Sequence, residues 1–210
     1  MSALLLTDVE ARVLGCLIEK DMSTPEYYPL SLNALVNACN QKTNREPVVQ
    51  YSEETVRDAV ESLRARQLAW VITGRDMRVP KYSHRAAETL DAGNRELAVL
   101  AVLLLRGPQT VAEIKERTQR LHEFDDAEAV EACLRRLAER ESAPLVRQLA
   151  RQPGAREPRW AHLLCGEPAP VAAAAPVAEA REALTERVAR LEEEVRQLRA
   201  ELADLRRLFE

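Results

Sequence analysis

The sequence predicts a mainly α-helical protein with small β-hairpins, an α+β fold, extended by a long C-terminal helix. Three observations favour this class. Glycine and aromatic residues are scarce while Leu, Ala, Glu and Arg are abundant, a composition typical of helical proteins. Two successive stretches each show helical apolar spacing three times, followed by strand-forming residues. Residues 181–210 then carry a continuous heptad pattern.

The first stretch opens with a capping box, because Thr7 and Glu10 stand three residues apart at the start of a helical pattern. Apolar residues at helical spacing continue this helix to Ile18. The same spacing predicts a second helix over residues 31–40 and a third that begins at Ser52.

The second stretch repeats this order. An apolar helical run covers residues 97–105 and ends before a Gly-Pro pair. Thr110 and Glu113 form another capping box, which opens a short helix through Arg117. A third helix is predicted over residues 125–140.

Each set of three helices is followed by strand-forming residues on either side of a turn, which predicts a β-hairpin. The paired segments are residues 68–73 with 79–83 and residues 145–150 with 158–164. Three helices followed by such a hairpin, or wing, is the arrangement of a winged helix-turn-helix domain. We therefore predict two tandem winged-helix domains, residues 1–88 and residues 89–166.

The C-terminal part is predicted to be a linker and a coiled coil. Residues 167–180 are an Ala/Pro linker, and residues 181–210 follow. The a and d positions of the heptads are Leu184, Val188, Leu191, Val195, Leu198, Leu202, Leu205 and Phe209. Val at a with Leu at d favours two strands, and opposite charges at g and e favour a parallel pair. We predict a parallel homodimer; the alternative is a single amphipathic helix packed against the rest of the chain.

Hydropathy and cysteine usage indicate the compartment in which the protein is expected. No apolar run reaches the roughly 18 residues needed to cross a membrane, and the first residues lack the basic segment of a signal peptide. The four cysteines form no CxxC pair, and three have apolar neighbours. This pattern predicts reduced, mostly buried thiols in a cytoplasmic protein that does not interact with a membrane.

Several strings in the sequence resemble the YceH family of bacterial proteins. They are LTDVEARVLGCLIEK, TPEYYPLSLNALVNACNQKTNREPVV, LLLRGPQT and VRQLARQPGAREPRWAHLL. The resemblance covers roughly residues 4–168, and ACNQKTNREPV is highly specific within it. It implies tandem winged-helix domains with a C-terminal coiled coil, in agreement with the pattern described above. It implies no particular activity, ligand or partner.

Duplex DNA is one predicted partner. Winged-helix proteins usually place the third helix in the major groove and the hairpin against the DNA backbone. The formal net charge of −4 argues against a strongly basic nucleic-acid binder, but residues 167–210 alone contribute −3 of it. Both third helices begin with acidic residues, which suit the helix dipole but not phosphate. Their best candidates for reading bases are Arg57, Arg64, Arg135 and Arg136.

The hairpins are more basic than the helices. Each hairpin segment has four cations against a single acid: Arg75, Arg78, Lys81 and Arg85 in the first, and Arg147, Arg151, Arg156 and Arg159 in the second. We therefore predict a contact with phosphates that is led by the hairpins and largely independent of sequence. The alternative is that these arginines only solvate exposed hairpins.

The loop before the first of these third helices is unusually polar. We expect Asn40 and Asn44 to cap backbone groups and residues 48–49 to anchor the loop in the core. Those roles leave the remaining long polar side chains unexplained. They are Gln41, Lys42 and Arg45, and we predict that they contact a group outside the chain, with nucleic acid as the first candidate.

Two other classes of function are compared with the sequence pattern. A protein-interaction adaptor resembling segregation-and-condensation protein B, without direct DNA binding, fits the mixed charge of the helices equally well. An enzyme is not expected, because the three histidines are isolated and no metal spacing, phosphate-binding loop or nucleophile elbow is present. We therefore predict no metal and no cofactor. Trp70 and Trp160 are expected in the core.

Overall fold

A computed structural model describes residues 5–74, 77–141 and 143–168. Over these ranges the chain forms seven α-helices, one 3-10 turn and two small antiparallel sheets. This is the mixed helix-and-strand class that the sequence predicted. The predicted coiled coil with its eight a and d residues, most of the linker and Arg75 lie outside the described ranges.

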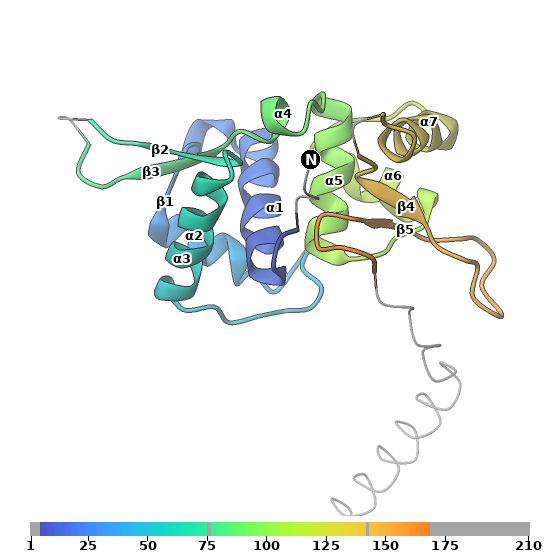
Figure 1. The fold of residues 1–210 in the computed structure, drawn as a ribbon, viewed down its shortest axis with the longest axis horizontal. Helices are drawn as coiled ribbons and strands as arrows, with labels where there is room; N and C mark the ends of the chain where they lie inside the picture. The colour runs from blue at the N-terminus through green and yellow to red at the C-terminus, as the bar shows by residue number, and fades with distance from the viewer. Residues whose placement is uncertain (1–4, 75–76, 142, 169–210) are drawn as a thin grey trace, which may run out of the picture. The chain divides into compact units, whose positions relative to one another are not determined.

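The first half of the described chain contains three main helices and a three-stranded sheet (Figure 1). Its elements are α1 (Asp8–Ser23), η1 (Pro25–Tyr27), β1 (Leu30–Ser31), α2 (Leu32–Cys39), α3 (Glu53–Ala65), β2 (Ala69–Ile72) and β3 (Lys81–His84). The side chains of Thr7, Ser31 and Ser52 each accept a hydrogen bond from the first turn of α1, α2 and α3. These local caps explain why the three helices begin where the sequence predicted.

The second half repeats the order of helices and hairpin. Its elements are α4 (Ala86–Thr89), α5 (Asn94–Arg106), α6 (Val111–Thr118), α7 (Ala127–Ala138), β4 (Val146–Gln148) and β5 (Trp160–His162). Thr110 and Asp126 cap α6 and α7. The short helix α4 was not predicted, because its four residues are too few to show a period.

The likeness of the two halves extends to a short strand that the sequence did not reveal. In the first half, the two residues of β1 pair with β3, so that the sheet order is β1-β3-β2. In the second half, Gln109 stands just before α6 as β1 stands just before α2, and it forms an isolated bridge with Trp160 of β5. Single pairings of this kind have no sequence pattern long enough to be recognised.

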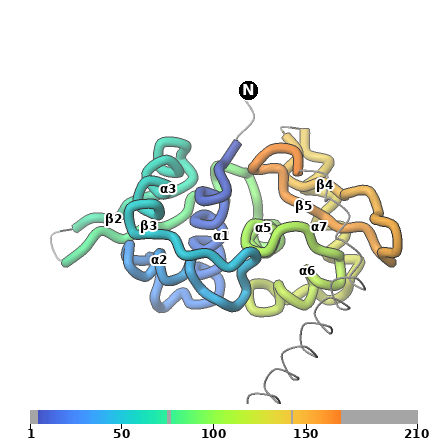
Figure 2. The backbone as a smooth tube through the Cα atoms, turned by 90° about the horizontal axis from the view of Figure 1, so that it is seen from below, coloured from blue at the N-terminus to red at the C-terminus, as the bar shows by residue number. Residues whose placement is uncertain are grey.

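The two halves share one hydrophobic core. All described residues fall in a single compact unit, in which α1 and α5 lie side by side and the two hairpins extend at opposite ends (Figures 1 and 2). Gly15 lets these helices approach closely, because a Cβ at Gly15 would lie only 3.0 Å from atoms of Leu104 and Leu105. The central part of α1, from Glu10 to Ile18, is buried on every side.

Some side chains differ from their predicted positions. Trp70 was expected in the core but is 53% exposed, because Ala69 takes the inward position of β2 and alternation turns the next residue outward. Val48, expected to anchor the loop, is 54% exposed.

Other side chains lie where they were predicted. Trp160 is buried. Three of the four cysteines are buried and all four are free thiols, as predicted, with Cys165 half-buried.

The described helices include none that is both long and apolar enough to cross a membrane.

Candidate nucleic-acid interface

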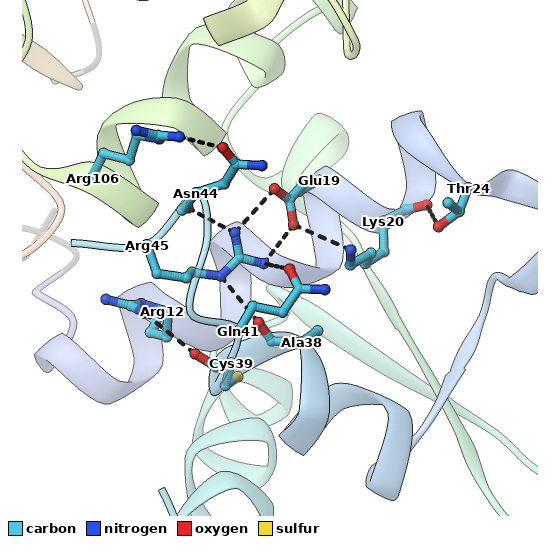
Figure 3. Close-up of polar contacts among 10 residues, drawn as sticks. All are labelled: Arg12, Glu19, Lys20, Thr24, Ala38, Cys39, Gln41, Asn44, Arg45 and Arg106. Atoms are coloured by element: carbon cyan, nitrogen blue, oxygen red, sulfur yellow. Dashed lines mark hydrogen bonds and ion pairs between the residues drawn. The ribbon is translucent and has the colours of Figure 1, made fainter. Parts of the chain in front are cut away.

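The guanidinium of Arg45 is enclosed by the loop between α2 and α3, which corrects the prediction that it contacts an external group. Its Nε donates to the carbonyl of Ala38 at 3.0 Å. Nη1 donates to Oε1 of Glu19 at 3.0 Å and to the carbonyl of Asn44 at 2.8 Å. Nη2 donates to Oε2 of Glu19 at 2.5 Å and to Oε1 of Gln41 at 3.0 Å (Figure 3). All five N–H donors of the guanidinium are therefore used inside the protein.

This ion pair keeps its charge in spite of burial. The side chain of Arg45 has no exposed surface and that of Glu19 is 12% exposed. Burial alone would lower the pKa of Arg45, but the hydrogen bonds and charge of Glu19 raise it above its ordinary value. The pair joins the loop to α1.

Further hydrogen bonds hold the loop in place, made by its own side chains and by Arg12 of α1. Asn40 donates to the carbonyl of Tyr51 at 2.9 Å and accepts from its N–H at 2.8 Å. Arg12 of α1, itself buried, donates to the carbonyl of Pro47 at 2.7 Å. Asn44 has a φ of 60° and accepts a hydrogen bond from Arg106 at the end of α5. The predicted capping role of Asn40 is confirmed, while the side chain of Asn44 contacts another side chain.

The three loop residues predicted to contact an external group thus have different surroundings. Arg45 is buried, and Gln41 is half-buried and positioned by Arg45. Lys42 is exposed, and the described part of the chain offers it no hydrogen-bond or ion-pair partner. Only Lys42 keeps a free charge for an external anion.

The four predicted base-reading arginines are all paired with carboxylates. On α3, Arg57 pairs with Glu53 and Arg64 with Glu61. On α7, the guanidinium of Arg135 lies 2.7 Å from Glu131.

The fourth, Arg136, lies 2.9 Å from the carboxylate of Glu96, which is almost fully buried at the start of α5. The guanidinium groups themselves are exposed, and the three pairs whose carboxylates are exposed as well contribute only about 0–1 kcal/mol each to stability. The neighbouring carboxylates nevertheless oppose the approach of a phosphate.

The hairpins carry the cations without carboxylate partners. Four of them form no ion pair within the described ranges: Arg78, Lys81, Arg151 and Arg156. Three of these four are exposed, and Lys81 is half-exposed on β3. These four residues are named the free hairpin cations below.

The other described cations of the hairpin segments have partners. Arg85 lies over the ring of Trp70, with 5.3 Å between its Cζ and the ring centroid. Arg147 pairs with Glu167. Arg159 donates to Glu113 at 2.9 Å and to the carbonyl of Pro108 at 2.8 Å, so its main role is to hold β5 to the start of α6.

The exposed face of the first hairpin was not predicted. Trp70, Met77 and Val79 are all exposed apolar residues of this hairpin. The alternating strand pattern around Trp70 could have indicated this position, because its buried neighbour Ala69 fixes the direction of the side chains along β2.

The side chains suited to metal binding or acid–base chemistry are dispersed or buried in the described part of the chain. Among the residues that the structure describes, no three His, Cys, Asp or Glu side chains are close enough to hold a metal ion. Nε2 of His84 lies 3.1 Å from Asp21, yet burial lowers its pKa in spite of that carboxylate. Burial lowers the pKa of His162 to about 4, and its Nδ1 is buried without a partner. Both histidines are therefore predominantly neutral at pH 7.

Comparisons with known proteins identify the family. A family model described as "Protein of unknown function, DUF480" matches residues 6–155, which reach from the start of α1 to the turn between β4 and β5. The chain belongs to the DUF480 family. The match covers both sets of three helices in this DUF480 chain.

Relatives of the DUF480 chain extend over almost its whole length. A UPF0502 protein of Solibacter usitatus is 52% identical over 206 residues, 98% of each chain. A UPF0502 protein of Geotalea uraniireducens is 53% identical over 210 residues, 98% of this chain and 95% of the relative. One from Vibrio parahaemolyticus is 49% identical over 205 residues, 96% of this chain and 94% of the relative. The resemblance to the YceH family, which these UPF0502 proteins represent, is confirmed.

Proposed function

We propose that this DUF480 chain is a non-enzymatic tandem winged-helix protein that binds duplex DNA through its two hairpins. The repeated order of three helices and a hairpin supports the two winged-helix domains, residues 1–88 and 89–166. In this assignment α2–α3 and α6–α7 are the two helix-turn-helix units.

One observation carries the proposal, namely how the cations are paired. The arginines of α3 and α7 that could reach bases are all paired with carboxylates, whereas the free hairpin cations have no such partner in the described chain. Contacts to phosphate need unpaired cations and carry no sequence information. The proposed mode is therefore a contact of the hairpins with the DNA backbone, aided by Lys42, with little reading of bases.

The first hairpin adds an apolar surface to its charge. Met77 and Val79 are exposed beside Arg78, and Trp70 carries Arg85 on its ring. Apolar side chains next to arginine suit the minor groove, where proteins place such residues against sugars and between base steps. This combination distinguishes the first hairpin from the second.

The predicted coiled coil over residues 181–210 increases the avidity of the proposed contact. Two hairpins per chain become four in a homodimer, and binding by one hairpin raises the effective concentration of the others. Weak individual contacts then add up to measurable affinity without sequence-specific recognition.

The proposal is tested by fluorescence anisotropy with a random-sequence duplex over a series of salt concentrations. We expect the affinity to fall steeply as the salt concentration rises. In a plot of log K against the logarithm of salt concentration, the steepness should decrease by about 0.9 for each lost phosphate contact. The test variant removes the free hairpin cations: Arg78→Gln, Lys81→Gln, Arg151→Gln and Arg156→Gln. Its affinity and salt slope should both decrease.

A matched control removes the same amount of charge from helices: Arg57→Gln, Arg64→Gln, Arg95→Gln and Arg135→Gln. This control should retain most of the affinity, because three of these arginines are paired with carboxylates or flanked by them. Equal losses in both variants would show that only net charge matters, and the absence of binding at low salt would reject the proposal.

A second candidate is a protein-interaction adaptor, resembling segregation-and-condensation protein B. The observation that favours it is a groove of about 400 Å³ between α3 and β2, lined by Glu61, Arg64, Ala65, Ala69, Trp70 and Val71. A partner peptide that occupies this groove would cover Trp70, which lines it. The affinity of such a complex would depend little on salt concentration. Trp70→Ala would abolish such a complex, whereas it should weaken DNA binding only partly and leave the salt slope unchanged, because the free hairpin cations remain.

A further inference from the structure

A polar cleft of about 630 Å³ lies where the loop between α2 and α3 meets α5 and α6. Its walls come from four segments: the end of α1, the loop, the end of α5 and the end of α6 with the residues after it. The volume is in the range of small-molecule sites.

The loop lines the cleft with hydrogen-bond donors. Gln41 and Asn44 each direct the amide oxygen at a guanidinium, that of Arg45 and that of Arg106 respectively. Since a guanidinium can only donate, these contacts fix the orientation of both amides. The NH₂ groups therefore point away from the two arginines, as Figure 3 shows, and form no hydrogen bond in the described chain.

Cations surround the same space. Lys20, Arg106, Arg117 and Arg120 line the cleft. Arg120 has no ion-pair partner in the described ranges, and Arg117 lies 3.8 Å from a carboxylate that also holds Arg159. Burial and the nearby charge of Arg117 both lower the pKa of Arg106, so these two cations repel one another.

The negative groups of the cleft do not balance these charges. The carboxylate of Glu19 is already paired with Arg45 and, at 3.7 Å, with Lys20, which leaves Glu116 as the other acid in the lining. Three helix ends contribute about half a negative charge each, and Lys20, Arg106 and Arg117 stand in those last turns. Arg120 lies beyond the end of α6. Its positive charge is therefore additional to the charges that compensate the helix dipoles.

We propose that the cleft binds a small polyvalent oxyanion, with Arg106, Arg117 and Arg120 as its charged ligands and the amides of Gln41 and Asn44 as neutral donors. Arginine suits phosphate and carboxylate equally, because both accept two parallel N–H bonds. The site contains none of the free hairpin cations, although Lys42 of the proposed DNA contact stands on the same loop, between Gln41 and Asn44. It also accounts for the polar character of the loop on its outer side, as the Arg45 network does on its inner side.

The experiment measures thermal unfolding and titration calorimetry of the full-length chain with pyrophosphate, ATP and citrate. Sodium chloride at equal ionic strength serves as the reference. We expect at least one anion to raise the unfolding temperature in a saturable way and to titrate with one site per chain. Preference for pyrophosphate and ATP over citrate would assign a phosphate ligand, and the reverse a carboxylate ligand.

Two variants test the assigned residues. Arg117→Gln with Arg120→Gln should weaken binding by roughly tenfold or more, since hydrogen bonds to charged groups are among the stronger ones. Asn44→Asp keeps the acceptor for Arg106, tolerates the positive φ and places a carboxylate in the cleft, so it should abolish binding. Neither change removes a core residue, and circular dichroism verifies that each variant is folded.

Arg95→Gln is the control for loss of an arginine away from the cleft, since Arg95 is exposed at the other end of α5. It should bind the anion as the unmodified chain does. The proposal is overturned if no anion exceeds the effect of sodium chloride, or if the cleft variants bind as tightly as Arg95→Gln.

Discussion

Arg45 and Glu19 meet through two parallel hydrogen bonds, of 3.0 and 2.5 Å, although 26 residues separate them in the chain. The pair attaches the loop before α3 to α1. The sequence of this loop suggested an element that binds an external group. On its inner face, however, the loop is part of the protein interior.

Replacement of Arg45 by Gln should therefore destabilise the protein strongly. The change leaves the largely buried carboxylate of Glu19 with only the more distant Lys20, at 3.7 Å, and loss of one partner of a buried pair typically costs about 3–5 kcal/mol. Urea unfolding followed by circular dichroism measures the effect. The double variant Glu19→Gln with Arg45→Gln should lose less than the sum of the single variants, because it leaves neither member of the buried pair charged and alone. A loss below about 1 kcal/mol in Arg45→Gln would contradict this role.

Gly15→Val should weaken the packing between the two halves. A side chain there would press on Leu104 and Leu105, and overpacking of this kind costs about 1–3 kcal/mol. Thermal unfolding should show a lower midpoint and limited proteolysis should cut the chain faster. Substitution of Gly74 by Val, where the nearest atoms are those of the flexible Met77 side chain, provides the comparison and should cost less.

Acid should destabilise the protein through His162. Its pKa is about 4 in the folded protein against an ordinary value of 6.5, so the unfolded chain binds the proton more readily. The contribution of neutral His162 is complete above pH 6.5 and is lost as the pH falls towards 4, by about 3 kcal/mol in all. Unfolding free energies measured between pH 4 and 7 should therefore depend less on pH in His162→Gln. An unchanged pH profile in that variant would show that His162 is not the responsible group.

The proposed dimer should dissociate when two d positions of the heptads are made acidic, as in Leu191→Glu with Leu198→Glu. Two carboxylates on each strand would face the partner strand in an apolar seam. Analytical ultracentrifugation should show a monomer, and DNA affinity should fall by about tenfold or more through lost avidity. Glu193→Gln, outside the seam, is the control and should remain dimeric. A monomeric unmodified chain would instead favour the single amphipathic helix.

The features predicted correctly from the sequence were those that depend on neighbouring residues. The capping boxes at Thr7 and Thr110 lie within four residues of the groups they satisfy, so their pattern is visible in the chain. The surroundings of Arg45 were not predictable, because Glu19 belongs to a different helix. An arginine that faces phosphate and an arginine that is buried in an ion pair look the same in a sequence.

In the candidate site too, features of neighbouring residues were predictable and contacts between distant residues were not. The basic character of the hairpins could be counted directly, but the pairing of Arg136 with Glu96 joins α7 to α5 and required the fold. The direction of Trp70 depended on which face of β2 meets the core. The cleft depended on four segments converging, so no single stretch of the sequence indicated it.

The close approach of α1 and α5 at Gly15 has a consequence for how the protein engages a partner. Two modules on a flexible tether can settle one after the other on almost any surface. Halves that share one interior cannot do so, and we expect the two hairpins to reach outward as a rigid span of set width. A partner that binds both hairpins at once must offer two contact sites at that separation. We therefore expect the protein to discriminate between partners by the spacing of those sites.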